Sequence, residues 1–148
     1  MIRHLTTGLL IATCGAQRSS LPPDRLVAFG ALERDAATSI VVERDGQVVG
    51  VIHWPDAPQQ EHRGVLSSTE LAALAQELRT HDCCALDSKR VYPYADEPRV
   101  TLSIKWNDLD CHVELWADEW TERADAKACH DAMLRASTRA ATGLPRAR

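Results

Sequence analysis

Apolar and polar residues alternate over several short segments, which predicts a protein rich in β-strands. In residues 39–54, two β-branched runs flank Asp45-Gly46, a dipeptide typical of a type I′ turn, so we expect a β-hairpin. Residues 25–32 predict a weaker first strand, and residues 55–63 read as a polar loop with two prolines. The first half of the chain is therefore expected to supply three strands.

A second hairpin is predicted from period-two alternation on both sides of a turn at residues 107–110. Along its first strand, apolar residues alternate with Thr101, Ser103 and Lys105, and the returning strand continues the same pattern. One face of this hairpin should therefore point into the core. The residues on that face are Val100, Leu102, Ile104, Trp106, Cys111, Val113 and Leu115.

Two helices complete the pattern. Ser67 and Glu70 have the spacing of a capping box, in which each side chain bonds the other residue's backbone N–H. Apolar residues follow at helical spacing, so a helix is expected from about Ser68 to Arg79 or His81. A last helix should occupy residues 121–138. The apolar residues of the first helix are Leu71, Leu74, Ala75 and Leu78.

The predicted order of elements is strand, hairpin, helix, hairpin, helix. The connections are too short for parallel crossovers, so the strands should be antiparallel. The fold class is therefore α+β, with one antiparallel sheet of about five strands and two helices on one face. The 148 residues suit a single domain, expected over residues 25–140, followed by a flexible tail at 141–148.

Charge and motif content exclude several function classes. The chain has 17 basic and 21 acidic side chains, a formal net charge of −4, which disfavours a nucleic-acid-binding protein. It lacks the sequence motifs of serine hydrolases, zinc proteases, P-loop proteins and dinucleotide-binding enzymes. The sequence therefore identifies no catalytic residue, and we expect neither a cofactor nor a metal.

The N-terminus has the features of an export signal. Met1-Ile2-Arg3-His4 is cationic, and the uncharged run that follows is short enough for a secretory signal but too short to span a membrane. The run ends at Cys14 and resembles the lipobox of bacterial lipoproteins, although Thr13 stands where that family usually has Gly, Ala or Ser.

In that family the cysteine receives a diacylglyceryl group and becomes the N-terminus after cleavage. The resemblance therefore implies that residues 1–13 are a signal peptide and that residues 14–24 form a lipidated tether. Gly15 implies the outer membrane, with the domain facing the periplasm. A signal peptide without lipidation, which would give a secreted protein, and a misplaced start codon are the alternatives.

The other four cysteines, an even number, predict two disulfides in an exported domain. A bond between the neighbours Cys83 and Cys84 would be strained, so each should bond to either Cys111 or Cys129, which leaves two connectivities open. The alternative, a zinc site, lacks the usual Cys-x₂₋₄-Cys spacing, and an oxidising compartment favours disulfides.

One acidic, Trp-containing segment is a candidate binding surface for a cationic partner or a glycan. Strand alternation places Trp116 on the polar face, and the neighbouring residues are mostly acidic. Acids are also favoured at the start of a helix, so a solvated helix terminus with packed tryptophans is the alternative. The residues of this predicted surface are Glu114, Trp116, Asp118, Glu119 and Trp120.

Two function classes follow. The first is a membrane-anchored, non-catalytic lipoprotein that binds an envelope protein or glycan or has a structural role. The second is a secreted enzyme whose active site cannot be recognised from sequence. The coarse order of strands and a capped helix also resembles secreted bacterial domains of the emfourin type, which inhibit metalloproteases. No shared residue string accompanies this resemblance, so it implies no site residue.

Overall fold

The computed structural model describes residues 17–31, 38–52, 58, 60–90 and 97–142. The strands form one antiparallel sheet in the order β4-β3-β2-β1-β5-β6. The strands are β1 (Arg25–Ala31), β2 (Thr38–Glu43), β3 (Gln47–Ile52), β4 (Gln60–Val65), β5 (Arg99–Trp106) and β6 (Leu109–Trp116). The helices are α1 (Ser68–Thr80), the 3-10 helix η1 (Cys83–Ala85), α2 (Glu119–Glu122) and α3 (Ala124–Thr142).

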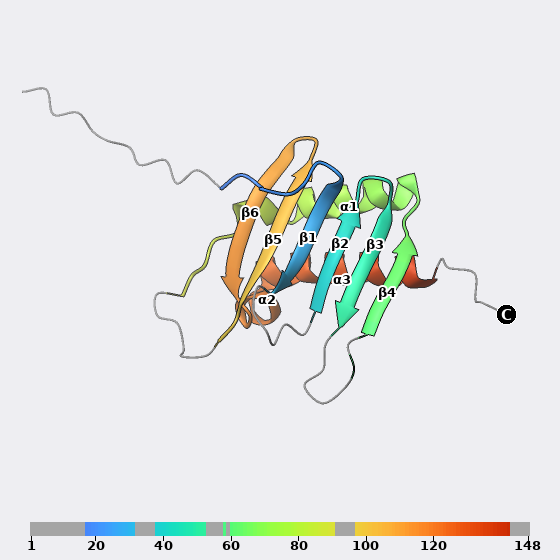
Figure 1. Ribbon diagram of the computed structural model, residues 1–148. Coiled ribbons are helices and arrows are strands. Elements are labelled where there is room, and N and C mark those ends of the chain that lie inside the picture. The colour runs from blue at the N-terminus through green and yellow to red at the C-terminus, as the bar shows by residue number, and fades with distance from the viewer. Residues whose placement is uncertain (1–16, 32–37, 53–57, 59, 91–96, 143–148) are drawn as a thin grey trace, which may run out of the picture.

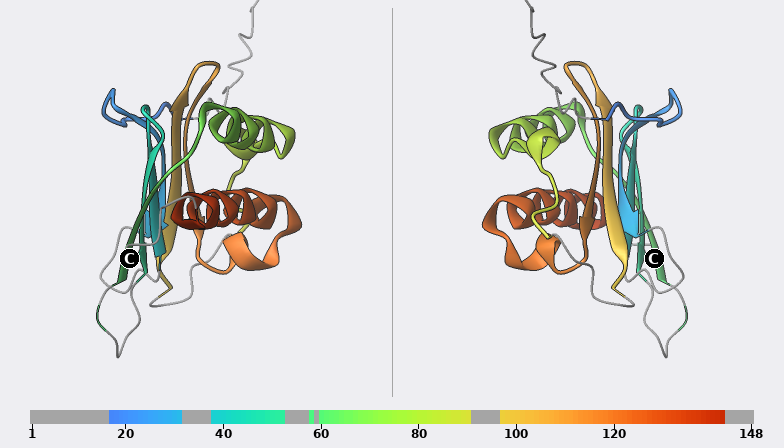
Figure 2. Two further views of the ribbon diagram at one scale, coloured as in Figure 1. Left: turned by 90° about the vertical axis from the view of Figure 1, so that its right-hand side faces the viewer. Right: turned by 90° about the vertical axis from the view of Figure 1, so that its left-hand side faces the viewer.

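The helices α1 and α3 lie side by side on one face of the sheet, and none of the helices formed by the described residues lies on the other face (Figures 1 and 2). The predicted α+β class, the antiparallel sheet and the placement of the helices are therefore confirmed. On the helix side, alternate strand residues such as Val27, Ile40 and Leu102 are almost completely buried. The opposite face of the sheet is called the open face below.

The capping box of α1 is formed as predicted. The Ser67 hydroxyl accepts from the Glu70 backbone N–H at 3.3 Å, and the Glu70 carboxylate accepts from the Ser67 N–H at 2.8 Å. The apolar side of the helix then packs into the core through Leu74, Ala75 and Leu78. The capping bonds fix where the helix begins, and the spacing of its apolar residues determines which side of it faces the sheet.

The first hairpin forms, but its turn differs from the predicted type I′ turn. Strand β2 ends at Glu43 and β3 begins at Gln47, so three residues connect them. The Gly46 N–H donates to the Glu43 carbonyl at 3.0 Å and closes the turn. Only Gly46 in this turn has a positive φ, +92°. A type I′ turn needs positive φ at both central residues, which Asp45 does not adopt.

Strand β4 was not predicted, because its sequence was interpreted as a polar loop. It is an edge strand, and its side chains are exposed except at Gly64. A Cβ atom at Gly64 would lie 2.1 Å from the Ala140 carbonyl oxygen of α3. The strand therefore contributes a backbone surface to the core, and hydrophobic alternation cannot reveal it.

The last predicted helix is divided in two. Arg123 is extended, with φ −79° and ψ 126°, and separates α2 from α3. Its guanidinium bonds the carboxylates of Glu119 and Asp125 and the carbonyl of Asp87. These contacts bridge the break between the two helices, and Trp120 of α2 is buried in the core.

Residues 17–24, which were predicted as part of a tether, are bound to the domain. The Gln17 carbonyl accepts from the His112 N–H at 2.7 Å, and the Ser19 N–H donates to the Asp110 carboxylate at 2.9 Å. Farther along, Arg44 donates to the Pro23 carbonyl at 2.9 Å. The segment lies on the open side of the sheet before it enters β1 (Figure 2). Cys14 lies outside the described residues.

Candidate functional site

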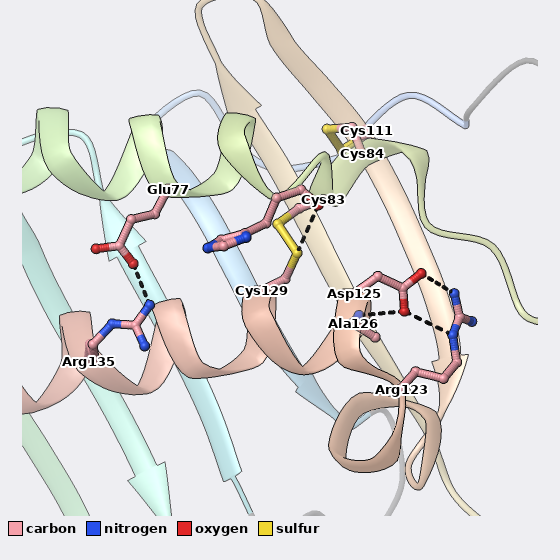
Figure 3. The surroundings of a disulfide bond; sticks show 10 residues. Glu77, Cys83, Cys84, Cys111, Arg123, Asp125, Ala126, Cys129 and Arg135 are labelled. Carbon is pink, nitrogen blue, oxygen red and sulfur yellow. Dashed lines mark hydrogen bonds and ion pairs between the residues drawn. A yellow bond between two sulfur atoms is a disulfide. The ribbon is translucent and has the colours of Figure 1, made fainter.

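The four cysteines other than Cys14 form two disulfides, as predicted. Cys83 pairs with Cys129, and Cys84 pairs with Cys111. The neighbouring cysteines of η1 therefore bond in different directions, one to α3 and one to β6 (Figure 3). The sequence had left the choice between the two connectivities open. The position of η1, between the end of α1, helix α3 and strand β6, decides it.

These bonds fasten the end of α1 to both layers of the fold. The separations of 46 and 27 residues between bonded cysteines each correspond to roughly 3.5–4 kcal/mol in the chain-entropy model. An ion pair between Glu77 and Arg135, 2.7 Å apart, joins α1 to α3 nearby (Figure 3). The disulfides therefore have a structural role.

The predicted binding surface is largely inside the protein. Trp120 is 1% exposed, its ring meets Phe29 edge-on at 5.1 Å between centroids, and its indole N–H donates to the Val100 carbonyl at 3.0 Å. Trp116 lies on the open face, as the alternation predicted, but is only 9% exposed. The Arg99 guanidinium lies 4.4 Å from its ring centroid. The expectation that the two tryptophans are exposed was therefore wrong.

Glu119 is buried as well, at 5% exposure, and acts as an acceptor for the surrounding chain. Its carboxylate accepts from the Ser88 hydroxyl at 2.8 Å, from the Lys89 N–H at 2.8 Å and from the Trp116 N–H at 3.1 Å. Arg123 pairs with it at 2.9 Å. Burial alone would raise the pKa of Glu119, but these bonds together lower that pKa below its ordinary value.

The other two acids of the predicted surface are also paired. Glu114 lies 2.7 Å from the Arg99 guanidinium, and Asp118 pairs with Arg90, which also pairs with Glu97. The acidic segment therefore connects β5, β6, α2 and the chain after η1. The sequence left two interpretations of this segment open, a binding surface and a helix terminus with packed tryptophans, and the contacts seen here give its residues a structural role.

A groove beside α1 is a better candidate for binding. It has a volume of about 460 Å³, and its apolar lining includes Leu26, Leu71 and Trp106. Arg44 and Arg79 also line it. The Arg79 guanidinium bonds both carboxylate oxygens of Asp108, at 2.5 and 3.0 Å, which lowers the pKa of that acid. The sequence pattern assigned Leu71 and Trp106 to the core, so it could not distinguish a groove wall from the interior.

A serine–histidine contact on the open face was also missed. Ser103 of β5 is directly opposite His112 of β6. The Ser103 hydroxyl oxygen lies 2.7 Å from the His112 Nδ1. Such a contact resembles a nucleophile and its base. It is equally a cross-strand hydrogen bond of an antiparallel pair. Only the pairing register brings the two residues together, so sequence spacing gave no indication of the contact.

No model of a known protein family matches this chain, and no curated protein matches its sequence significantly. Within the described ranges, no group of three or more His, Cys, Asp or Glu side chains could hold a metal ion. Among the same residues, no helix is both long and apolar enough to cross a membrane.

Proposed function

We propose that this protein is an exported bacterial lipoprotein whose folded domain binds an envelope protein. The observation that carries the proposal is the cysteine pairing. Both disulfides fall within the folded domain, which fits an oxidising compartment, and they use every cysteine except Cys14. That remaining thiol follows a cationic start and a short apolar run, where lipoproteins carry their lipid.

The chemistry at Cys14 proceeds in two steps. Its thiol sulfur forms a thioether to the diacylglyceryl group of a phospholipid, and the phosphate headgroup leaves with the thiol proton. Water then hydrolyses the peptide bond between Thr13 and Cys14, which releases residues 1–13. One acyl chain alone anchors a protein only marginally, whereas two or more give stable attachment. Because Gly15 follows the lipidated cysteine, the proposed localisation is the outer membrane, with the domain in the periplasm.

Metabolic labelling tests the anchor. A fatty-acid analogue should label the wild-type protein and not Cys14→Ser, and the variant should leave the membrane fraction. Unlabelled wild-type protein recovered outside the membrane fraction would contradict the anchor and favour a secreted protein.

The groove beside α1 supports binding as the role of the domain, and the partner is proposed to place an apolar side chain there. Ala72 lines the groove and is exposed, so Ala72→Arg would obstruct it without disturbing the core. Ala141 is exposed on α3, outside the groove lining, and Ala141→Arg is the matched control. A cross-linked partner in intact cells should be lost only with Ala72→Arg; equal cross-linking by both variants would refute the role of the groove.

A secreted hydrolase is the second candidate, and only the contact between Ser103 and His112 favours it. A fluorophosphonate probe tests this alternative directly. Labelling that disappears in Ser103→Ala would support an enzyme. Labelling that is absent from wild-type protein would remove this candidate.

A further inference from the structure

We infer that the domain rests directly on the membrane, with the edge of the sheet formed by β6 facing the lipid surface. This inference rests on the proposed lipid anchor at Cys14. It concerns the orientation of the domain, which a lipid anchor alone does not determine, because many anchored domains could rotate freely on a flexible tether.

The first step is the length of free chain. Gln17 forms an antiparallel bridge with His112 in β6, the outermost strand on its side of the sheet. Two residues, Gly15 and Ala16, separate Cys14 from Gln17, and each of the three steps between neighbouring Cα atoms spans at most about 3.6 Å in a fully extended chain. The lipidated sulfur is therefore attached within about 11 Å of chain length from the edge of the sheet.

The second step is the attachment of residues 17–24 to the domain. Hydrogen bonds with His112 and Asp110 hold the beginning of this segment against β6. Hydrogen bonds with Arg44 hold its end beside β2. The segment therefore works as a strap across the open side of the sheet rather than as a spacer. The chain is therefore held to the domain from Gln17 onward.

The third step compares this length with the size of the domain. A folded unit of this size has a radius of gyration of about 14 Å, so its far side lies well beyond the reach of an 11 Å tether. Rotation that brought β4 to the membrane would require the strap to detach. The bilayer should therefore meet the β6 edge and the adjoining part of the open face, whereas β4 and the end of α3 that packs against β4 near Ala140 face away from it.

Two exposed positions near opposite edges of the sheet serve as probes. Lys105 is exposed on β5, opposite Asp110 of β6, and Gln60 is exposed on β4, the strand at the other edge. A photo-reactive benzophenone amino acid replaces each of these residues in turn in the full-length protein. The acylated protein is purified from membranes and reconstituted in phosphatidylethanolamine–phosphatidylglycerol vesicles. Mass spectrometry then measures the fraction of protein that carries one cross-linked phospholipid.

The expected result is at least about fivefold more lipid adduct from position 105 than from position 60. Inserting about ten Gly and Ser residues after Cys14 should lengthen the tether and reduce this ratio towards one. Equal adduct from both positions with the natural tether, in protein whose mass shows acylation, would overturn the inference alone. Protein without any acyl mass would overturn the proposed anchor, and the orientation with it.

Discussion

Replacing Glu119 should destabilise the domain more than replacing any exposed acid near it. Glu119→Ala removes the acceptor of three donors, namely Ser88, Lys89 and Trp116, and one partner of Arg123. A buried donor without an acceptor costs roughly 1–3 kcal/mol. The Trp116 N–H is buried and bears the full cost, whereas Ser88 and Lys89 are partly accessible to water. Arg123 retains Asp125.

We therefore expect a loss of about 3 kcal/mol in the free energy of unfolding. Urea denaturation at pH 7, with the disulfides intact, measures this quantity. Glu119→Gln retains one acceptor oxygen and should lose less. Glu122 lies on the same short helix but is exposed, so Glu122→Ala is the matched control and should change stability by less than about 0.5 kcal/mol.

The pH dependence gives an independent check of the same reasoning. The pKa of Glu119 is lower in the folded protein than in the unfolded chain, so its contribution is complete above the unfolded pKa and is lost as pH falls through the folded pKa. The difference between wild type and Glu119→Gln should therefore shrink in acid. A cost below about 1 kcal/mol for Glu119→Ala at pH 7 would refute the structural role of this carboxylate.

Three further predictions concern other parts of the fold. Gly64→Ala should lower the free energy of unfolding by more than about 2 kcal/mol, because the new Cβ would lie 2.1 Å from the rigid Ala140 carbonyl oxygen. Gly50→Ala should lower it less, because its Cβ would lie 2.8 Å from the Ser137 hydroxyl, which can rotate away, and equal melting temperatures of the two variants would contradict this. Burial lowers the pKa of His130, so the wild-type protein should lose stability as pH falls from about 6.5 towards the pKa of His130 in the folded state. Denaturation of His130→Gln should show a smaller loss of stability over that pH range, and the same pH profile in both proteins would exclude the effect. Trp116→Ala should lower the free energy of unfolding by about 2–3 kcal/mol, because the ring is packed beneath Arg99. A nearly unchanged melting temperature would contradict this structural role of Trp116.

The elements predicted from sequence are those whose physical cause is local. The capping box specifies where α1 begins, and the alternation around Leu102 and Val113 specifies which face of the second hairpin is buried. Strand β4 has no such local cause. It is an edge strand whose inward contact is the backbone of Gly64 against α3, a relation between segments far apart in the chain.

The misassigned surface has a related explanation. Alternation correctly placed Trp116 on the open face, but a residue on that face is exposed only if no long side chain covers it, and Arg99 does. Acidic residues are usually exposed, so no sequence pattern indicated that Glu119 is buried among backbone donors. The number of disulfides followed from counting cysteines, whereas their connectivity required the position of η1.

The most direct test of the whole account is the intact mass of the protein purified from its native membrane fraction, measured before and after reduction. We predict a chain that begins at Cys14, carries the added mass of a diacylglyceryl group and gains four hydrogens on reduction, two for each disulfide. A mass that corresponds to all 148 residues without lipid, and that does not change on reduction, would contradict both the anchor and the oxidised fold.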